Sequence, residues 1–202
     1  MSESVQQEYP LFPLGSVLFP GGRLALRIFE RRYLDLIRDC MRQQSSFGIV
    51  LLAPGESEVD HPGQQAPQLS AMGCEARVVD WDQLPDGLLG ITVEGGRRFQ
   101  VLASRRADSG LHLGEVQWCE EVEDIPLPAD CASMESLLRQ LTSHPHVERL
   151  GLSAEVNGAG ELVNRLAQLL PLPASDTYPL LAIDSPLDRL DALHDLLEQF
   201  ES

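Results

Sequence analysis

The 202-residue chain contains no lysine, and its 15 Lys or Arg residues are all arginine. A P-loop needs a lysine beside the β- and γ-phosphates, and the glycine-rich spacing of that loop is also missing. Arginine cannot act as the base of a Ser-Lys peptidase or form a Schiff base, because its guanidinium group stays protonated. The sequence therefore predicts neither an ATPase nor a Ser-Lys peptidase, and it predicts no cofactor such as lysine-held pyridoxal phosphate.

Sequence signals for a membrane span and for export are missing as well. No apolar run approaches the roughly 18 to 20 residues that cross a bilayer. The first ten residues, MSESVQQEYP, contain neither a positively charged start nor an apolar stretch, so no signal peptide is predicted. With 43% apolar residues, an ordinary content for a packed core, the chain is expected to be a cytoplasmic globular protein.

Cysteine and histidine lack the spacing of a metal site. The four cysteines form no CxxC pair and have no histidine beside them (Cys40, Cys74, Cys119 and Cys131). We expect buried, reduced thiols, with a zinc site as the alternative. Among the five histidines only His144 and His146 cluster, in an expected turn between helices, and no metal is predicted there.

Carboxylates dominate the charge of the chain, with 31 Asp and Glu against 15 Arg and a formal net charge of −16. Residues 1–50 have a net charge of +1, whereas residues 51–202 have a net charge of −17. Such a field repels phosphate backbones and anionic lipid head groups, so neither nucleic acid nor a membrane surface is a predicted partner. The acidic run after Arg106 is either a solvated surface or a site that attracts basic partner segments.

The most informative stretch is residues 9–33, which read YPLFPLGSVLFPGGRLALRIFERRY. Pro10 and Pro13 cannot donate to a β-ladder, which predicts a very short strand or a sheet edge. Pro20-Gly21-Gly22 has the residues of a turn. Apolar and polar residues alternate over 23–28 as in a half-buried strand, and a strand is expected at residues 24–29.

From Glu30 onward the apolar period changes from two residues to that of a helix. The expected apolar face of this helix consists of Tyr33, Leu34, Ile37, Cys40 and Met41. A strand, a turn, a second strand and a helix are therefore predicted in that order, with Phe12 and Phe29 as core anchors.

The remaining residues divide into a β-rich part and a helical part. Further strands are expected at residues 47–53, 70–82, 88–94, 97–103 and 111–119, with a loop from Pro54 to Pro67 and a hairpin turn at Pro85-Asp86-Gly87. Helices are expected at residues 129–141 and 160–170, and a last one follows Ser185 as N-cap with Pro186 at its first position. The acidic residues 120–128 are the expected joint, so the chain is predicted to contain a β-rich domain, residues 1–122, and an α-helical subdomain, residues 123–202.

These motifs resemble the N-terminal, substrate-recognising domain of Lon proteases. In that family a PLFPL strand, an LFPG turn, a second strand and a helix opened by IFE-x-RY follow one another, as they do here from Pro10 to Tyr33. The hairpin that ends in Arg98-Phe99 resembles a later part of the family. Leu180-Leu181 followed by Leu187–Leu190 resembles its helical LLE…RL segment, although Ala182 stands where the family often has an acid. The resemblance implies an α+β fold: a PUA-like bent β-sheet or pseudo-barrel with one helix, followed by a small C-terminal α-helical bundle.

The same resemblance implies a non-enzymatic protein-binding or peptide-binding module. Its expected partners are unfolded proteins or peptides, with a separate protease or chaperone as a further candidate. The alternatives are a hydrolase that uses Cys or Ser with His, for which the GxSxG and HExxH motifs are missing, and an RNA-binding protein by analogy with the PUA-like fold.

Two arginine pairs are the candidate contact residues for a partner. Arg31, Arg32, Arg97 and Arg98 are the densest positive points of this acidic chain. Guanidinium groups are frequent anchors of interfaces. The alternative is that these arginines form ion pairs with carboxylates of the chain itself.

Overall fold

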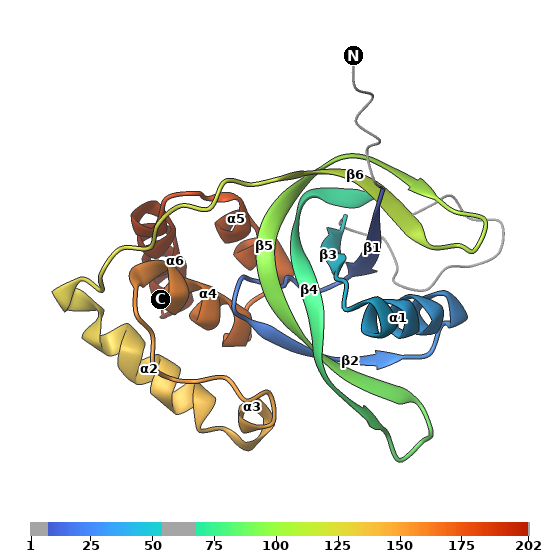
Figure 1. Cartoon of the computed structure of the whole chain (residues 1–202). Helices are drawn as coiled ribbons and strands as arrows, with labels where there is room; N and C mark the ends of the chain where they lie inside the picture. Colours follow the sequence, from blue (N-terminus) through green and yellow to red (C-terminus); the bar gives the residue numbers. More distant parts are fainter. Residues whose placement is uncertain (1–7, 54–67, 202) are drawn as a thin grey trace.

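The computed structural model describes residues 8–53 and 68–201 and shows a bent β-sheet with helices on two sides (Figure 1). The loop expected between Pro54 and Pro67 lies outside the described residues. The strands are β1 (Tyr9–Leu14), β2 (Arg23–Ile28), β3 (Phe47–Leu52), β4 (Leu69–Gln83), β5 (Leu89–Arg106) and β6 (His112–Trp118). The helices are α1 (Arg31–Gln43), the 3-10 turn η1 (Ala129–Cys131), α2 (Ala132–Thr142), α3 (Pro145–Glu148), α4 (Ala159–Leu169), α5 (Ala174–Ala182) and α6 (Pro186–Glu201).

The six strands pair in the order β2-β5-β4-β3-β1-β6, and β6 also pairs with β5. A closed ring is therefore formed by strands β1, β3, β4, β5 and β6. Strand β2 lies outside this ring and pairs with the first half of β5, residues Leu89–Glu94. Only β1 and β3 run parallel; the other pairs are antiparallel. This arrangement confirms the predicted α+β fold with a pseudo-barrel and C-terminal helices.

Strand β5 differs from the prediction, because residues 88–94 and 97–103 belong to one long strand instead of two. Its first half pairs with β2 and its second half with β6. The register against β4 shifts between Cys74 and Ala76, as at a β-bulge, and a bulge bends a strand without ending it. Gly95 and Gly96 lie at this bend, which explains why the sequence pattern looks interrupted there.

The inside of the ring is filled by a few large side chains. Phe99 is fully buried there together with Leu11 and Val50. A Cβ added to Gly48 or Gly73 would lie 2.4 or 2.5 Å from the ring of Phe99, so these two glycines provide the space that the ring occupies. Of the Arg98-Phe99 pair in the family-like hairpin, Phe99 thus lies in the core of the barrel.

Helix α1 covers a second core, in which Phe12 stacks on Tyr33 at a ring-centroid distance of 4.0 Å. The prediction that Phe12 is a core anchor is confirmed, since only 6% of it is exposed. The same prediction for Phe29 is wrong, because 58% of it is exposed. Side chains alternate along a strand, so Phe29 points outward once Ile28 points into the core. Leu34 and Met41 of α1 are also exposed, contrary to the predicted apolar face.

The turn after β1 connects the sheet to the helices. Gly21 donates a hydrogen bond to the carbonyl of Gly95, and Gly95 donates one to the carbonyl of Gly22, both at 2.9 Å. On the other side of the turn, Phe19 is buried among the residues of α2, α4, α5 and α6. The side chain of Gln168 in α4 accepts a hydrogen bond from the backbone N–H of Phe19 at 3.0 Å. The helical part therefore shares its core with the loop that follows β1.

The helices expected from periodicity are present as η1 with α2, as α4 and as α6. Ser185 accepts a hydrogen bond on its Oγ from the backbone N–H of Asp188 at 3.3 Å, which confirms the predicted N-cap. No helix in the described part of the chain is long and apolar enough to cross a membrane.

Candidate functional site

Two strand edges flank an apolar groove on the β-rich part. Strand β6 pairs with β1 only over Tyr9–Leu11, and β2 pairs only with β5, so each of β1 and β2 keeps one edge that no other described strand covers. A groove of about 320 Å³ lies between these edges. It is lined by Phe12, Pro13 and Leu14 of β1, by Ala25, Leu26, Arg27 and Ile28 of β2, and by Phe29, Glu30 and Tyr33. We call this feature the β1–β2 groove.

Phe29 lies at the β1–β2 groove with more than half of its surface in contact with solvent. Burying a phenylalanine side chain is worth about 1.5–3 kcal/mol, so an exposed one beside an apolar groove favours contact with another molecule. The groove joins this apolar surface to main-chain groups of two strands that no other described strand pairs with. Such an arrangement can bind an extended polypeptide through side chains and main chain together.

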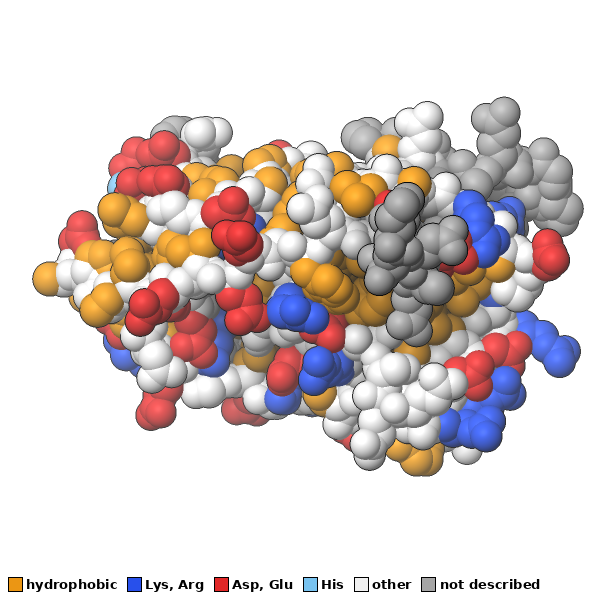
Figure 2. All heavy atoms as spheres, turned by 45° about the horizontal axis from the view of Figure 1, so that its top comes forward, with side chains coloured by type: hydrophobic (Ala, Val, Ile, Leu, Met, Phe, Trp, Pro, Cys, Tyr) orange, Lys and Arg blue, Asp and Glu red, His pale blue; other side chains and the backbone are white. Residues whose placement is uncertain are grey.

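The segment that borders the β1–β2 groove is positively charged. Residues 23–42 contain six arginines and three carboxylates, a net charge of +3 in a chain of −16. Arg31 is exposed, whereas Arg32 forms an ion pair with Glu30 at 2.7 Å and donates to the carbonyl of Gly110. In the view of Figure 2, acidic side chains gather over the helical part, and most of the visible arginines lie over the middle and the β-rich part.

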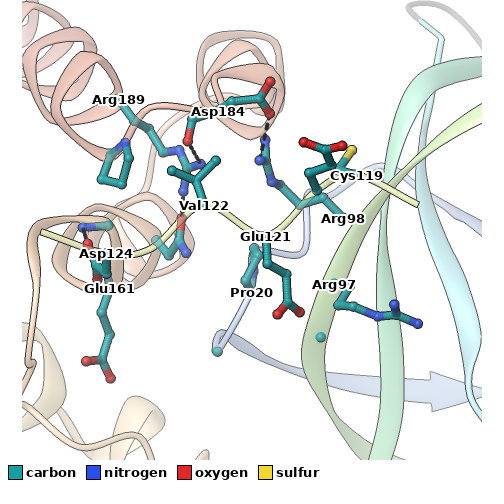
Figure 3. A pocket seen from close by; sticks show the side chains of 16 residues that line it. Pro20, Arg97, Arg98, Cys119, Glu121, Val122, Asp124, Glu161, Asp184 and Arg189 are labelled. Carbon is teal, nitrogen blue, oxygen red and sulfur yellow. Dashed lines mark hydrogen bonds and ion pairs between the residues drawn. The ribbon is translucent and has the colours of Figure 1, made fainter. Parts of the chain in front are cut away.

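Arg97 and Arg98, the second predicted pair, border a different cavity of about 370 Å³ between the sheet and the helices (Figure 3). Only 8% of Arg98 is exposed, and it donates to the carbonyls of Leu181 and Ile183 at 2.8 and 3.1 Å. It also pairs with Asp184 at 2.8 Å. Arg98 therefore fastens β5 to the connection between α5 and α6.

The side chain of Arg97 points away from Arg98 and stacks on Trp118, with its guanidinium carbon 4.3 Å from the ring centroid (Figure 3). Of the four predicted contact residues, the structure leaves Arg31 and Arg97 exposed. It brings neither arginine pair close to the other, since one lies at α1 and the other at the joint with the helices. Their role in binding a partner stays a prediction.

The cavity at the joint is held together by contacts within the chain. Arg189 is buried and donates to Asn164 Oδ1 at 2.8 Å; burial, together with the charge of Arg98, lowers the pKa of Arg189 to about 10, so it remains charged at neutral pH. Asp124 accepts hydrogen bonds from the backbone N–H groups of Gly160 and Glu161 at 2.7 and 3.0 Å, which caps the start of α4. These charged groups serve the joint, and the β1–β2 groove is the better candidate for binding.

A buried carboxylate braces the bend of the sheet. Glu75 is 5% exposed and accepts hydrogen bonds from Ser46 Oγ at 2.8 Å, from Arg77 at 3.1 Å and from the backbone N–H of Arg97 at 3.3 Å. Burial by itself would raise the pKa of the Glu75 carboxyl, but these hydrogen bonds and the charge of Arg77 hold the pKa below its usual value.

The lowered pKa of Glu75 predicts a loss of stability in acid. The folded-state pKa lies below the unfolded-state pKa, so the contribution is present above the unfolded-state pKa and is lost as the pH falls through the folded-state pKa. Urea unfolding of Glu75→Gln should therefore lose less stability between neutral pH and about pH 3 than the unchanged chain does. Asp191→Asn, the same change of charge on an exposed carboxylate of α6, is the control and should follow the unchanged chain. Parallel pH profiles for the chain and Glu75→Gln would contradict the prediction.

Comparison with known proteins identifies the family. The sequence profile described as the ATP-dependent protease La (LON) substrate-binding domain matches residues 8–199. The chain belongs to this family. The resemblance seen in the motifs from Pro10 to Tyr33 is thereby confirmed over nearly the whole chain.

The curated relatives are much longer proteins than this chain. The chain is 29% identical over 187 residues to Lon protease 2 of Myxococcus xanthus, and the aligned region covers 91% of the chain and 19% of that protein. It is 24% identical over 198 residues to the Lon protease of Escherichia coli K12, which covers 95% of the chain and 24% of that protein. The chain thus spans about a fifth to a quarter of the length of these relatives.

Solved structures show the same fold. A Lon N-terminal domain protein from Xanthomonas campestris is 39% identical and superposes with a TM-score of 0.72 over 94% of this chain and 98% of that one. The N-terminal domain of a Mycobacterium avium complex Lon protease is 16% identical, with a TM-score of 0.62 over 94% of this chain and 97% of that one. The LON substrate-binding fold therefore fills nearly all of the chain.

The β1–β2 groove was not predicted from the sequence. The unusual Phe29 is its clearest sequence signal, but the two strands that form the groove do not pair with each other, and local periodicity says nothing about a gap between them.

Proposed function

We propose that this chain is a non-enzymatic module that binds unfolded proteins or peptides through the β1–β2 groove. The observation that carries the proposal is the exposed Phe29 beside an apolar groove whose two walls are strands with an uncovered edge. Membership of a family described as substrate-binding supports the same role. The whole-chain protease activity named for the relatives is not carried over, because the match covers only a fifth to a quarter of them.

The proposal extends to location and partners. Its setting is the cytoplasm, with residues 1–122 as the binding domain and residues 123–202 as a helical subdomain that braces it. A separate protease or chaperone is the proposed recipient of the bound protein. The net charge of −16 supports a protein partner over nucleic acid, because phosphate backbones are repelled by such a surface.

Titration with a labelled, permanently unfolded protein of near-zero net charge tests this function. The full chain should bind it weakly, with an affinity that changes little between low and high salt, because apolar contacts are not screened by ions. Phe29→Ala should weaken binding by about tenfold, in line with about 1.5 kcal/mol or more for a buried phenylalanine side chain. Phe200→Ala removes an equally exposed phenylalanine from α6 and is the matched control.

Four results would count against the proposal. Loss of binding in Phe200→Ala alone would place the site on the helical part. Binding abolished by moderate salt would indicate an electrostatic adaptor. Absence of binding to any unfolded protein, or binding to a labelled single-stranded RNA instead, would leave only the family and the fold standing.

A further inference from the structure

The β1–β2 groove has the form of a missing strand position. Strands β2-β5-β4-β3-β1 form a continuous sheet that curls until its two outer strands, β2 and the second half of β1, line the same groove. An extended segment is the natural occupant of a groove walled by two strand edges, because it can pair with an edge through its main chain. Pro13 has no N–H to donate, whereas Arg23–Ile28 contains no proline. The edge of β2 is therefore the better partner for main-chain hydrogen bonds.

The charges around the groove indicate the chemistry of this occupant. Several arginines of the bordering segment are engaged within the chain: Arg23 with Glu94, Arg27 with Asp86, Arg32 with Glu30, and Arg38 with Asp35 and Asp39. Arg31 and Arg42 are both exposed and form no ion pair with a carboxylate of the described residues. Arg31 follows directly after Glu30, a residue of the groove wall. With Glu94 and Asp86 included, six arginines face five carboxylates, a net charge of +1 that rests on the exposed Arg31 and Arg42. This border therefore favours a segment that carries carboxylates.

Resting on the proposed function, we propose that the β1–β2 groove binds an extended apolar segment flanked by acidic residues. The segment pairs with the free edge of β2 as an added strand and packs an apolar side chain against Phe29. Its carboxylates lie toward Arg31 at the start of α1. The net charge of −16 over the whole chain repels such a segment, whereas Arg31 attracts it to the border of the groove.

A second exposed apolar surface provides the internal control. Met41 of α1 and Val79 and Trp81 of β4 line a separate groove of about 310 Å³, and 59% of Trp81 is exposed. Asp80 and Arg77 also line that groove, and Arg77 pairs with Glu75 at 3.1 Å, so the groove has no arginine like Arg31 that is exposed and free of a carboxylate partner among the described residues. Removal of Trp81 should therefore leave the binding of an acidic segment unchanged.

The experiment uses the full chain and three matched synthetic peptides of about ten residues, measured by fluorescence anisotropy. The first has a central run of alternating apolar residues with Glu at both ends, the second has Lys in place of each Glu, and the third is the first with N-methyl groups on alternate residues. We expect the Glu peptide to bind about tenfold more tightly than the Lys peptide at low salt, since each exposed ion pair is worth up to about 1 kcal/mol. The N-methylated peptide should bind at least about tenfold more weakly than the Glu peptide, because its methylated nitrogens cannot donate hydrogen bonds to the edge of β2.

Variants of the chain locate the site. Arg31→Glu should remove most of the preference for the Glu peptide, whereas Arg149→Glu, the same charge change at an exposed arginine of the helical part, should keep it. Phe29→Ala should weaken binding of both peptides at least about fivefold, while Trp81→Ala should not. Amide hydrogen exchange of Ala25–Ile28 should slow when the Glu peptide is bound.

The outcomes separate this inference from the proposed function. Two results, each with an unfolded protein still bound, would overturn the acidic added strand and leave the binding function intact. The first is equal binding of the Glu and Lys peptides. The second is binding of the N-methylated peptide as tight as that of the Glu peptide. Loss of binding in Trp81→Ala would move the site to the α1–β4 groove and also overturn it. Failure of every peptide and every unfolded protein to bind would remove both proposals.

Discussion

Replacing Phe12 with alanine is expected to destabilise the folded chain by about 3–5 kcal/mol, the usual cost of removing a buried phenylalanine. Phe12 is 6% exposed, stacks on Tyr33 and lies 6.0 Å from the ring of Phe47, so its removal leaves a cavity between β1 and α1. For a chain of this size about 1 kcal/mol corresponds to about 2–4 °C in melting temperature, so the midpoint should fall by about 6–20 °C.

Phe29→Ala is the matched control for Phe12→Ala, because it removes the same side chain from the same motif. Phe29 is 58% exposed and should change stability by no more than about 0.5 kcal/mol. Thermal unfolding followed by circular dichroism measures both variants. Equal losses in the two would mean that Phe29 is packed in solution, and it would then be a poor candidate for binding a partner.

Alanine at Gly95 should destabilise the chain to a similar extent by a different mechanism. An added Cβ would lie 2.0 Å from the carbonyl oxygen of Phe19 and 2.8 Å from its carbonyl carbon. Both are backbone atoms, so no change of rotamer relieves the overlap and the turn after β1 must move away from β5. Overpacking usually costs about 1–3 kcal/mol, and the two hydrogen bonds between Gly95 and the turn add about 1 kcal/mol each, which gives a total of about 3–5 kcal/mol.

Gly87→Ala separates this steric effect from the intrinsic preference of glycine. Gly87 has a φ of +84° and no neighbouring atom within 4 Å of an added Cβ. Gly87→Ala should therefore destabilise the chain by only about 1–2 kcal/mol, the cost of a left-handed conformation for a residue with a side chain. Urea-unfolding midpoints compare the two variants. A smaller loss for Gly95→Ala than for Gly87→Ala would show that the turn is not held against β5 in solution.

The two variants probe the two halves of the family motif. Phe12 belongs to the PLFPL strand and Gly95 to the strand that contacts the LFPG turn. The turn also carries Phe19 into the helical core, where Gln168 binds its backbone. The motif thus links barrel, bend and helices, and its aromatic and glycine residues serve the fold except for Phe29.

Several properties were determined by the sequence itself. The 202 residues contain no lysine, so no fold of this chain can place a lysine ε-amine in a site. The existence of most strands, of the helices α1, α2, α4 and α6, and of the N-cap at Ser185 follows from local patterns, which depend on neighbours within one turn or one strand. The continuity of β5 and the helices α3 and α5 were not predicted in this way. Phe12 was predictable as a core residue because it lies in an apolar strand beside an amphipathic helix.

Tertiary structure alone decided which of two similar neighbours is buried. Arg97 and Arg98 are adjacent and chemically identical, yet Arg98 is enclosed by carbonyls and Asp184, 86 residues further along, while Arg97 stays exposed. Phe29 is exposed because none of the elements within residues 8–53 and 68–201 packs over it. The β1–β2 groove exists because the curled sheet does not pair β1 with β2. These features depend on contacts between residues far apart in the chain, and local periodicity contains no information about such contacts.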